Sequence, residues 1–251
     1  MSDPRLRKCA RLLREGDDVL LHGGPELVAE TEIPAEQLAN AVWGEPDGSF
    51  TTDRFETTPE RVWADWLDFW EETAIEPAKT EPQPVHDRIV ELVENGHVST
   101  VITENVFGLL RAAGLSADDC IEFHGRADVA RCEYCERTFD ATPKQTTGLR
   151  RCPACGGTLG PGIVLAGEPP ARHDRLYTYS RAEQCDIYIA AGTQLTIDPT
   201  AENAEHALET GATLVVIGER PTPFDDDADY RLRDNPASTL ARLRDTLAIM
   251  G

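Results

Sequence analysis

Two Cys-x-x-Cys pairs constrain this chain more than any other feature of its sequence. The first pair is Cys132 and Cys135, the second is Cys152 and Cys155, and sixteen residues separate them. Each pair can form a tight turn that presents two sulfurs, and this separation lets the two turns meet around one tetrahedral Zn²⁺. Four sulfur ligands leave no position for water or substrate, so the predicted zinc is structural. A disulfide framework is the alternative interpretation of the same thiols.

Composition limits the partners that the chain can have. Its 251 residues suffice for one main core with a small appended module, and 45 acidic against 24 basic residues give a net charge of -21. Such a surface repels nucleic-acid phosphates, so we expect no nucleic-acid partner. An acid-rich, lysine-poor surface is typical of proteins that stay soluble in molar salt, which suggests a salt-adapted, halophilic protein. The N-terminus lacks a signal-peptide layout and no apolar run is long enough to span a membrane, so we expect a cytoplasmic protein without a membrane partner.

Other cysteines and histidines carry weaker signals. Cys9, Cys120 and Cys185 lie in or beside apolar runs and are expected to be core residues. The histidines other than His124 show no metal-ligand spacing, and we expect them at the surface or in turns. They are His22, His86, His97, His173 and His206.

Hydrophobic periodicity predicts alternating strands and helices. Strands are expected at 17–22, 98–103, 120–123, 186–191, 212–217 and, weakly, 229–233. Helices are expected at 5–15, from 58 onward, at 85–95, 173–184, 199–210 and 236–249. Residues 35–58 look irregular, and the aromatic stripe that ends at Trp70 is expected to pack in a core. The alternation predicts an α/β fold, a Rossmann-like doubly wound parallel sheet with a small four-cysteine zinc module.

Polar or glycine residues follow several of the predicted strands. They are Gly23 and Gly24, Glu104 and Asn105, His124, Gly192 and Thr193, and Gly218. Parallel strands place their carboxyl ends at one edge, where ligands bind in doubly wound sheets. We therefore expect these residues to gather around a nucleotide-sized cleft. Gly23-Gly24 taken alone is equally consistent with an ordinary strand-to-loop turn.

Six ordered motifs resemble the sirtuins, NAD-dependent protein-lysine deacylases. The matching segments are 101–109, 122–125, 152–157, 161–168, 191–195 and 214–217. By this resemblance His124 is the general base that acts on a ribose hydroxyl, and Asn105 positions the ribose or an attacking water. Gly23, Gly24, Glu104, Gly192, Thr193 and Gly218 would contact NAD, and Ile163 and Val164 would line the site for an acylated lysine of a protein or peptide. The resemblance also implies a Rossmann-like domain over 1–125 and 161–251, with a helical insertion at about 35–84, and a zinc module at 126–160.

Several positions depart from the family pattern and indicate a divergent member with a degenerate NAD loop. The family's threonine-glycine-alanine-glycine loop is His22-Gly-Gly-Pro25 here, and Pro25 removes an N–H donor. Ala35, Glu36 and Gln37 replace the aspartate, phenylalanine and arginine of the nicotinamide-side loop, and Glu104 replaces a glutamine. Glu26 and Glu104 would face a polyanionic cofactor unless they turn away. Two functions follow from the sequence: an NAD-dependent deacylase with an altered pocket, or a catalytically silent binding or scaffold protein of the same fold.

Overall fold

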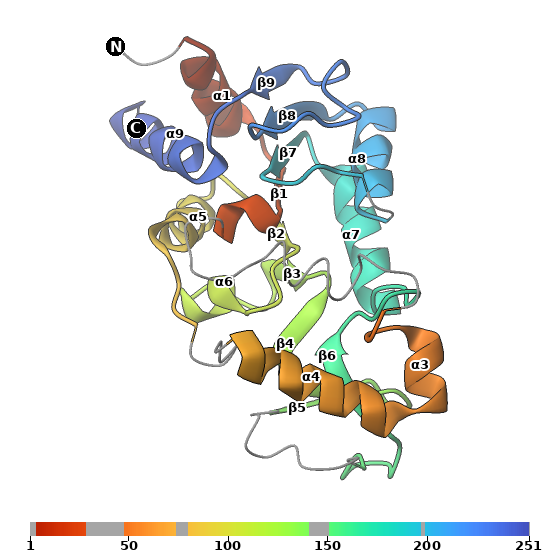
Figure 1. The fold of residues 1–251 in the computed structure, drawn as a ribbon. Coiled ribbons are helices and arrows are strands. Elements are labelled where there is room, and N and C mark those ends of the chain that lie inside the picture. Colours follow the sequence, from red (N-terminus) through yellow and green to blue (C-terminus); the bar gives the residue numbers. More distant parts are fainter. Residues whose placement is uncertain (1–3, 29–47, 74–79, 141–150, 197–198, 251) are drawn as a thin grey trace.

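The computed structural model describes residues 4–28, 48–73, 80–140, 151–196 and 199–250 (Figure 1). The replacements at Ala35, Glu36 and Gln37 lie outside the described residues, as do 35–47 and 74–79 of the insertion predicted at about 35–84. None of the described helices is long and apolar enough to cross a membrane.

A six-stranded parallel sheet forms the larger part of the molecule. Its strand order is β3-β2-β1-β7-β8-β9. The strands are β1 (Val19–Gly23), β2 (Thr100–Thr103), β3 (Cys120–Glu122), β7 (Ile187–Ala191), β8 (Thr213–Ile217) and β9 (Tyr230–Leu232). The order reverses between β1 and β7, which is the Rossmann arrangement with a switch point at those two strands. The predicted fold class is therefore confirmed.

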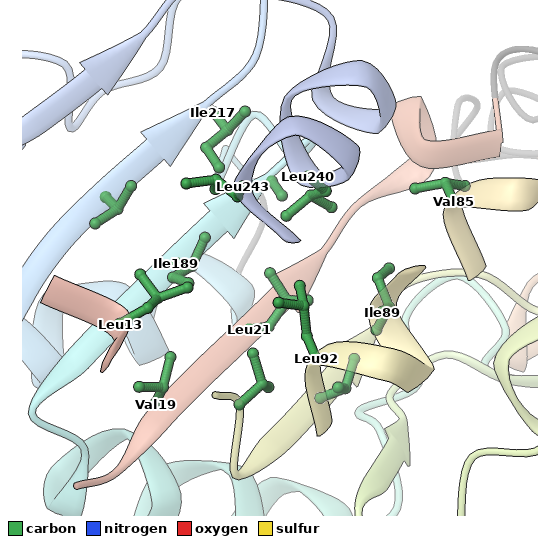
Figure 2. Packing of buried hydrophobic residues seen from close by; sticks show 14 of the residues in the cluster. Leu13, Val19, Leu21, Val85, Ile89, Leu92, Ile189, Ile217, Leu240 and Leu243 are labelled. Atoms are coloured by element: carbon green, nitrogen blue, oxygen red, sulfur yellow. The ribbon is translucent and has the colours of Figure 1, made fainter. Parts of the chain in front are cut away.

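Helices cover both faces of this sheet. One face carries α1 (Pro4–Glu15), α5 (Pro84–Glu94) and α9 (Pro236–Met250), and the other carries α7 (Arg172–Gln184) and α8 (Thr200–Glu209), as Figure 1 shows. Side chains alternate between the faces. Leu21 and Ile189 pack under α5 and α9 (Figure 2), whereas Leu20 and Tyr188 pack in the cluster on the opposite face. Burial on both faces explains why the strands are nearly continuous apolar runs.

A second unit is built on a three-stranded antiparallel sheet. It consists of β5-β4-β6, formed by β4 (Gly125–Cys132), β5 (Thr138–Asp140) and β6 (Leu159–Ile163). Two helices, α3 (Thr52–Thr57) and α4 (Pro59–Thr73), share one hydrophobic cluster with these strands. The indole Nε1 of Trp63 donates to the Leu159 carbonyl at 2.7 Å. The aromatic stripe is thus core, and it belongs to the zinc-bearing unit; the predicted boundaries at 126 and 160 stay a prediction.

Two short elements complete the connections to the sheet. They are η1 (Pro25–Val28) after β1 and α6 (Leu109–Ala112) after β2. Both follow strands at the carboxyl edge, so they shape the loops there.

The structure corrects one expectation about secondary structure and one about the burial of His86. Within the stretch predicted to be irregular, α3 is helical, and the Thr51 side chain caps it by accepting from the Arg54 N–H. Its six residues are too few to show a helical period in the sequence. His86 is buried, not at the surface: its Nδ1 accepts from the Gln83 N–H at 2.9 Å and caps α5. Cys9, Cys120 and Cys185 are buried as expected.

Candidate functional site

The carboxyl ends of five strands meet at one edge, as the sequence predicted. Backbone hydrogen bonds link them directly. They are Glu104 N–H to Gly23 O at 2.9 Å, Gly24 N–H to Ala191 O at 2.9 Å, Phe123 N–H to Thr103 O at 3.0 Å and Gly192 N–H to Ile217 O at 2.8 Å. Residues that are far apart in the chain therefore form one continuous rim, because the strands are parallel and in register.

The loop after β1 is packed tightly against the loop after β7. A Cβ added to Gly24 would lie 2.4 Å from the Gly192 carbonyl oxygen, so only glycine fits there. The N–H groups of Gly24, Glu26 and Leu27 donate to the carbonyls of Ala191, Gly192 and Gly24, and Pro25 has no N–H. These donors hold the loops together and do not point at a ligand. The role of Gly24 that this structure shows is to let the loop after β1 pack closely against the loop after β7.

Glu26 turns toward the end of β8. Its Oε1 lies 3.4 Å from Nε of Arg220, and its Oε2 lies 3.6 Å from the position that a Cβ on Gly218 would take. Burial raises the pKa of Glu26, and Arg220 opposes that shift. The carboxylate thus occupies the rim where the loops after β1, β7 and β8 meet.

A chain of polar contacts runs beneath the rim through His22. The Nδ1 atom of His22 lies 2.7 Å from the Tyr188 hydroxyl, and its Nε2 lies 2.9 Å from Oε1 of Glu104. The hydroxyl of Thr193 donates to the same Oε1 at 2.6 Å. His22 is fully buried, so the expectation that it lies at the surface was wrong. The sequence does contain a signal for this burial: His22 stands inside an apolar strand, and Glu104 directly follows the end of another strand.

The charges in this group are set by burial and by these contacts. Burial alone would raise the pKa of Glu104, but the hydrogen bond and charge of His22, with smaller effects of His124 and Thr193, lower it below its ordinary value. Burial lowers the pKa of His124, against an opposing effect of the Glu104 charge. Burial raises the pKa of Tyr188 well above its ordinary value. At neutral pH the rim therefore presents a Glu104 carboxylate beside a neutral His124 imidazole.

Asn105 is held in a fixed orientation by its own backbone. Its Oδ1 accepts the Phe107 N–H at 2.8 Å, and its N–H donates to the Thr103 hydroxyl at 3.1 Å. An Asx turn of this kind uses the carbonyl oxygen of the side chain. Among the contacts of the described residues, the side-chain NH₂ of Asn105 is the group that remains to donate to a ligand.

Ile163 and Val164 have different surroundings. Ile163 is buried in the cluster of the second unit, and its neighbour Val164 lines a cavity of about 700 Å³ together with Phe123, Gly125 and Tyr177. The Val164 N–H donates to the His124 carbonyl at 2.9 Å, so this segment also fixes the backbone of His124. The cavity lies between the second unit and α7, and its lining includes neither Glu104 nor Asn105.

The four cysteines converge into one cluster. Their sulfur atoms lie within 4.8 Å of one another, with Cys132 Sγ 3.5 Å from Cys155 Sγ and Cys135 Sγ 3.7 Å from Cys152 Sγ. A tetrahedral zinc with bonds of about 2.3 Å requires sulfurs about 3.8 Å apart, whereas a disulfide requires about 2.0 Å. Gly157 packs against this cluster, since a Cβ there would lie 3.1 Å from Cys132 Sγ. The site fits a structural Zn²⁺, and the disulfide alternative does not fit.

The six-stranded sheet has the Rossmann strand order, and the unit with the four cysteines is inserted between its two halves. These features define the class as Rossmann-like proteins with a small zinc-binding unit. The family model described as Sir2 family matches residues 37–199. The chain is 31% identical over 219 residues to NAD-dependent protein deacetylase 1 of Pyrobaculum aerophilum, covering 86% of this chain and 84% of that protein. It is 28% identical over 245 residues to an NAD-dependent protein deacetylase of Haloarcula marismortui, covering 95% and 93%.

Solved structures agree with these matches. A Sir2 homologue solved as a mutant in complex with ADP-ribose superimposes with a TM-score of 0.81 at 25% identity, covering 99% of this chain and 98% of that one. The chain belongs to the Sir2 family, the sirtuins.

Proposed function

We propose that the chain is an NAD-dependent protein-lysine deacylase with a structural zinc. The observation that carries this proposal is the neutral His124 held at the carboxyl edge beside Glu104, in a chain whose relatives are named as deacetylases and deacylases. A histidine that is neutral near pH 7 can act as a general base. The cofactor, when bound, supplies the ribose that takes up the acyl group.

The chain's own residues have distinct tasks in this proposal. His124 accepts a proton from a ribose hydroxyl, and the side-chain amide of Asn105 orients the ribose or a water. Thr193 and Gly192 line the cofactor side of the rim, together with Gly23, Gly24 and Gly218. The acylated lysine of a protein or peptide enters along Ile163 and Val164, where an extended peptide can pair with the backbone as an added strand. The proposal also includes that the protein functions in a salt-rich cytoplasm, which is based on its net charge of -21.

A second function is favoured by a separate observation. The N–H groups of Gly24, Glu26 and Leu27 are used within the chain, and Glu26 brings a carboxylate to the rim. A pyrophosphate would find few donors there. A loop with few free donors and an added carboxylate is what we would expect in a catalytically silent binding or scaffold protein of the same fold.

Calorimetry with NAD separates the two functions, followed by a nicotinamide-release assay on an acetylated peptide. Both are run in molar salt because of the acidic surface. We expect measurable binding of NAD and release of nicotinamide that depends on the peptide. Binding of the peptide without heat from NAD, and without nicotinamide, would support the silent binding protein.

The Glu26→Gln variant is expected to bind NAD about tenfold more tightly than the wild type, since one like charge near the phosphates is removed. Glu26 keeps 20% of its side-chain exposure, so salt screens it less than a surface charge. Calorimetry at several salt concentrations measures the effect. Glu219→Gln is the matched control, because Glu219 is exposed and directly follows Gly218 in the chain. We expect its NAD affinity to change by less than about twofold. An unchanged or weaker affinity in Glu26→Gln would show that this carboxylate does not face the cofactor.

A further inference from the structure

Four polar side chains from separate parts of the chain form a continuous line of contacts inside the rim. The order is Tyr188, His22, Glu104 and Thr193, with distances of 2.7, 2.9 and 2.6 Å. His22 has no exposed side-chain area and Glu104 keeps 13%. Buried ionisable groups are costly unless they are paired, so these residues depend on one another.

The contacts hold His22 between Tyr188 and Glu104 and fix the position of the Glu104 carboxylate. The Tyr188 hydroxyl keeps its proton, because burial raises the pKa of this group, and it lies 2.7 Å from Nδ1 of His22. Nε2 of His22 lies 2.9 Å from Oε1 of Glu104, an ion-pair distance. Thr193 donates to that same oxygen and accepts from the Leu195 N–H at 3.2 Å. Thr193 and His22 therefore both contact Oε1 of Glu104.

We propose that His22 is a positioning residue of this site: with Thr193 it holds Glu104 as a carboxylate beside His124, and His22 and Glu104 form one functional unit. Replacing His22 alone leaves a largely buried carboxylate short of a donor. Replacing both residues by the neutral threonine and glutamine of the family pattern removes the carboxylate as well. The inference rests on the proposed function for its effect on turnover, and its structural part is testable without turnover.

Four groups interact with Glu104, and they come from three strands or the segments that follow them. They are His22 at the end of β1, His124 after β3, Tyr188 on β7 and Thr193 after β7. His22 and Thr193 contribute to keeping Glu104 charged, and the Glu104 charge in turn raises the pKa of His124 against the effect of burial. His22 has a smaller opposing effect on His124. His22 therefore affects the pKa of the proposed general base, His124, mainly by keeping Glu104 charged.

A thermal-stability cycle tests the coupling without any assay of activity. We expect His22→Thr to lower the melting temperature by about 5 °C, because the 2.9 Å contact of His22 with a largely buried carboxylate is lost. Glu104→Gln should change it little, since the amide oxygen can still accept from His22 and Thr193. The double variant should melt above His22→Thr. Equal or lower stability of the double variant would overturn the proposed unit.

Titration by NMR tests the charge of Glu104 and its effect on His124. In His22→Thr the Glu104 carboxyl should titrate at higher pH than in the wild type, because its strongest stabilising partner is gone. In Glu104→Gln the His124 imidazole should titrate at lower pH than in the wild type, because the Glu104 charge that raises its pKa is gone. His86→Thr is the matched control: this buried histidine caps α5, so its loss should reduce stability and leave both titrations unchanged. An unchanged Glu104 titration in His22→Thr would overturn the proposal.

The pH dependence of turnover adds a functional readout. If the chain is active, the acidic limb of its kcat/KM profile should move to lower pH in Glu104→Gln, in step with the His124 titration. An active variant whose limb does not move would show that Glu104 does not act on the base. If neither NAD binding nor nicotinamide release is found, the proposed function fails, while the melting cycle and the NMR titrations still decide the role of His22.

Discussion

Replacing His124 by alanine is expected to lower kcat/KM for deacylation by about a thousandfold, within the usual range for loss of a general base. NAD affinity should stay within about threefold of the wild type, because the imidazole acts on a proton and is not a principal binding group. Nicotinamide release on an acetylated peptide and calorimetry with NAD measure the two quantities.

The direction of the pH dependence of deacylation follows from the pKa of His124. Burial lowers the pKa of His124, so the imidazole stays neutral and able to accept a proton to a lower pH than an exposed histidine. Activity should be level near neutrality and fall as the pH drops through the His124 pKa. His173→Ala is the control, because its side chain is 84% exposed at the start of α7. A His124→Ala variant with more than a third of wild-type activity would remove this residue from the mechanism.

Removing one zinc-binding turn should have the largest effect on stability. We expect the variant with both Cys152→Ser and Cys155→Ser to lose its zinc and to melt more than about 10 °C lower, since binding of a structural zinc contributes directly to folding. Cys132 and Cys152 belong to the same buried cluster as Trp63 and Trp66, so tryptophan emission should shift to the red. Metal analysis, calorimetry and fluorescence measure these changes.

Cys185→Ser is the matched control for the zinc variant. Cys185 is buried like Cys152, whereas Cys155 is exposed, and Cys185 lies in the cluster on the α7–α8 face of the main sheet, away from the four-sulfur group. It should keep one zinc per chain and its tryptophan emission. Retention of stoichiometric zinc by the double serine variant would show that the metal is not held by these four thiols.

Local patterns predicted most of the fold. The apolar runs at residues 187–191 and 213–217 are strands as expected, and Pro59 opens the helix that carries the aromatic stripe. Patterns of this kind depend on near neighbours in the chain, so they can be recognised without tertiary structure. The six-residue helix α3 was missed because it is shorter than two helical turns and is stabilised by its cap and by packing against β6.

The candidate site was predicted in part. That Gly23, Glu104, His124 and Gly192 share one edge follows from parallel strand order, and the structure agrees. The burial of His22, its pairing with Glu104 and the turn of Glu26 toward Arg220 were not predicted. Each of these depends on which side chains meet across strands that are far apart in sequence.

By itself the sequence determined the alternation of strands and helices, the four-thiolate zinc site and the order of motifs that mark the family, because each depends on short-range spacing. Only the tertiary structure decided how the two carboxylates near the rim are compensated. The register of β1 against β7 brings His22 close to Tyr188, and the register of β1 against β2 brings it close to Glu104. The energy of a buried charge is set by such neighbours, and they exist only once the sheet has formed.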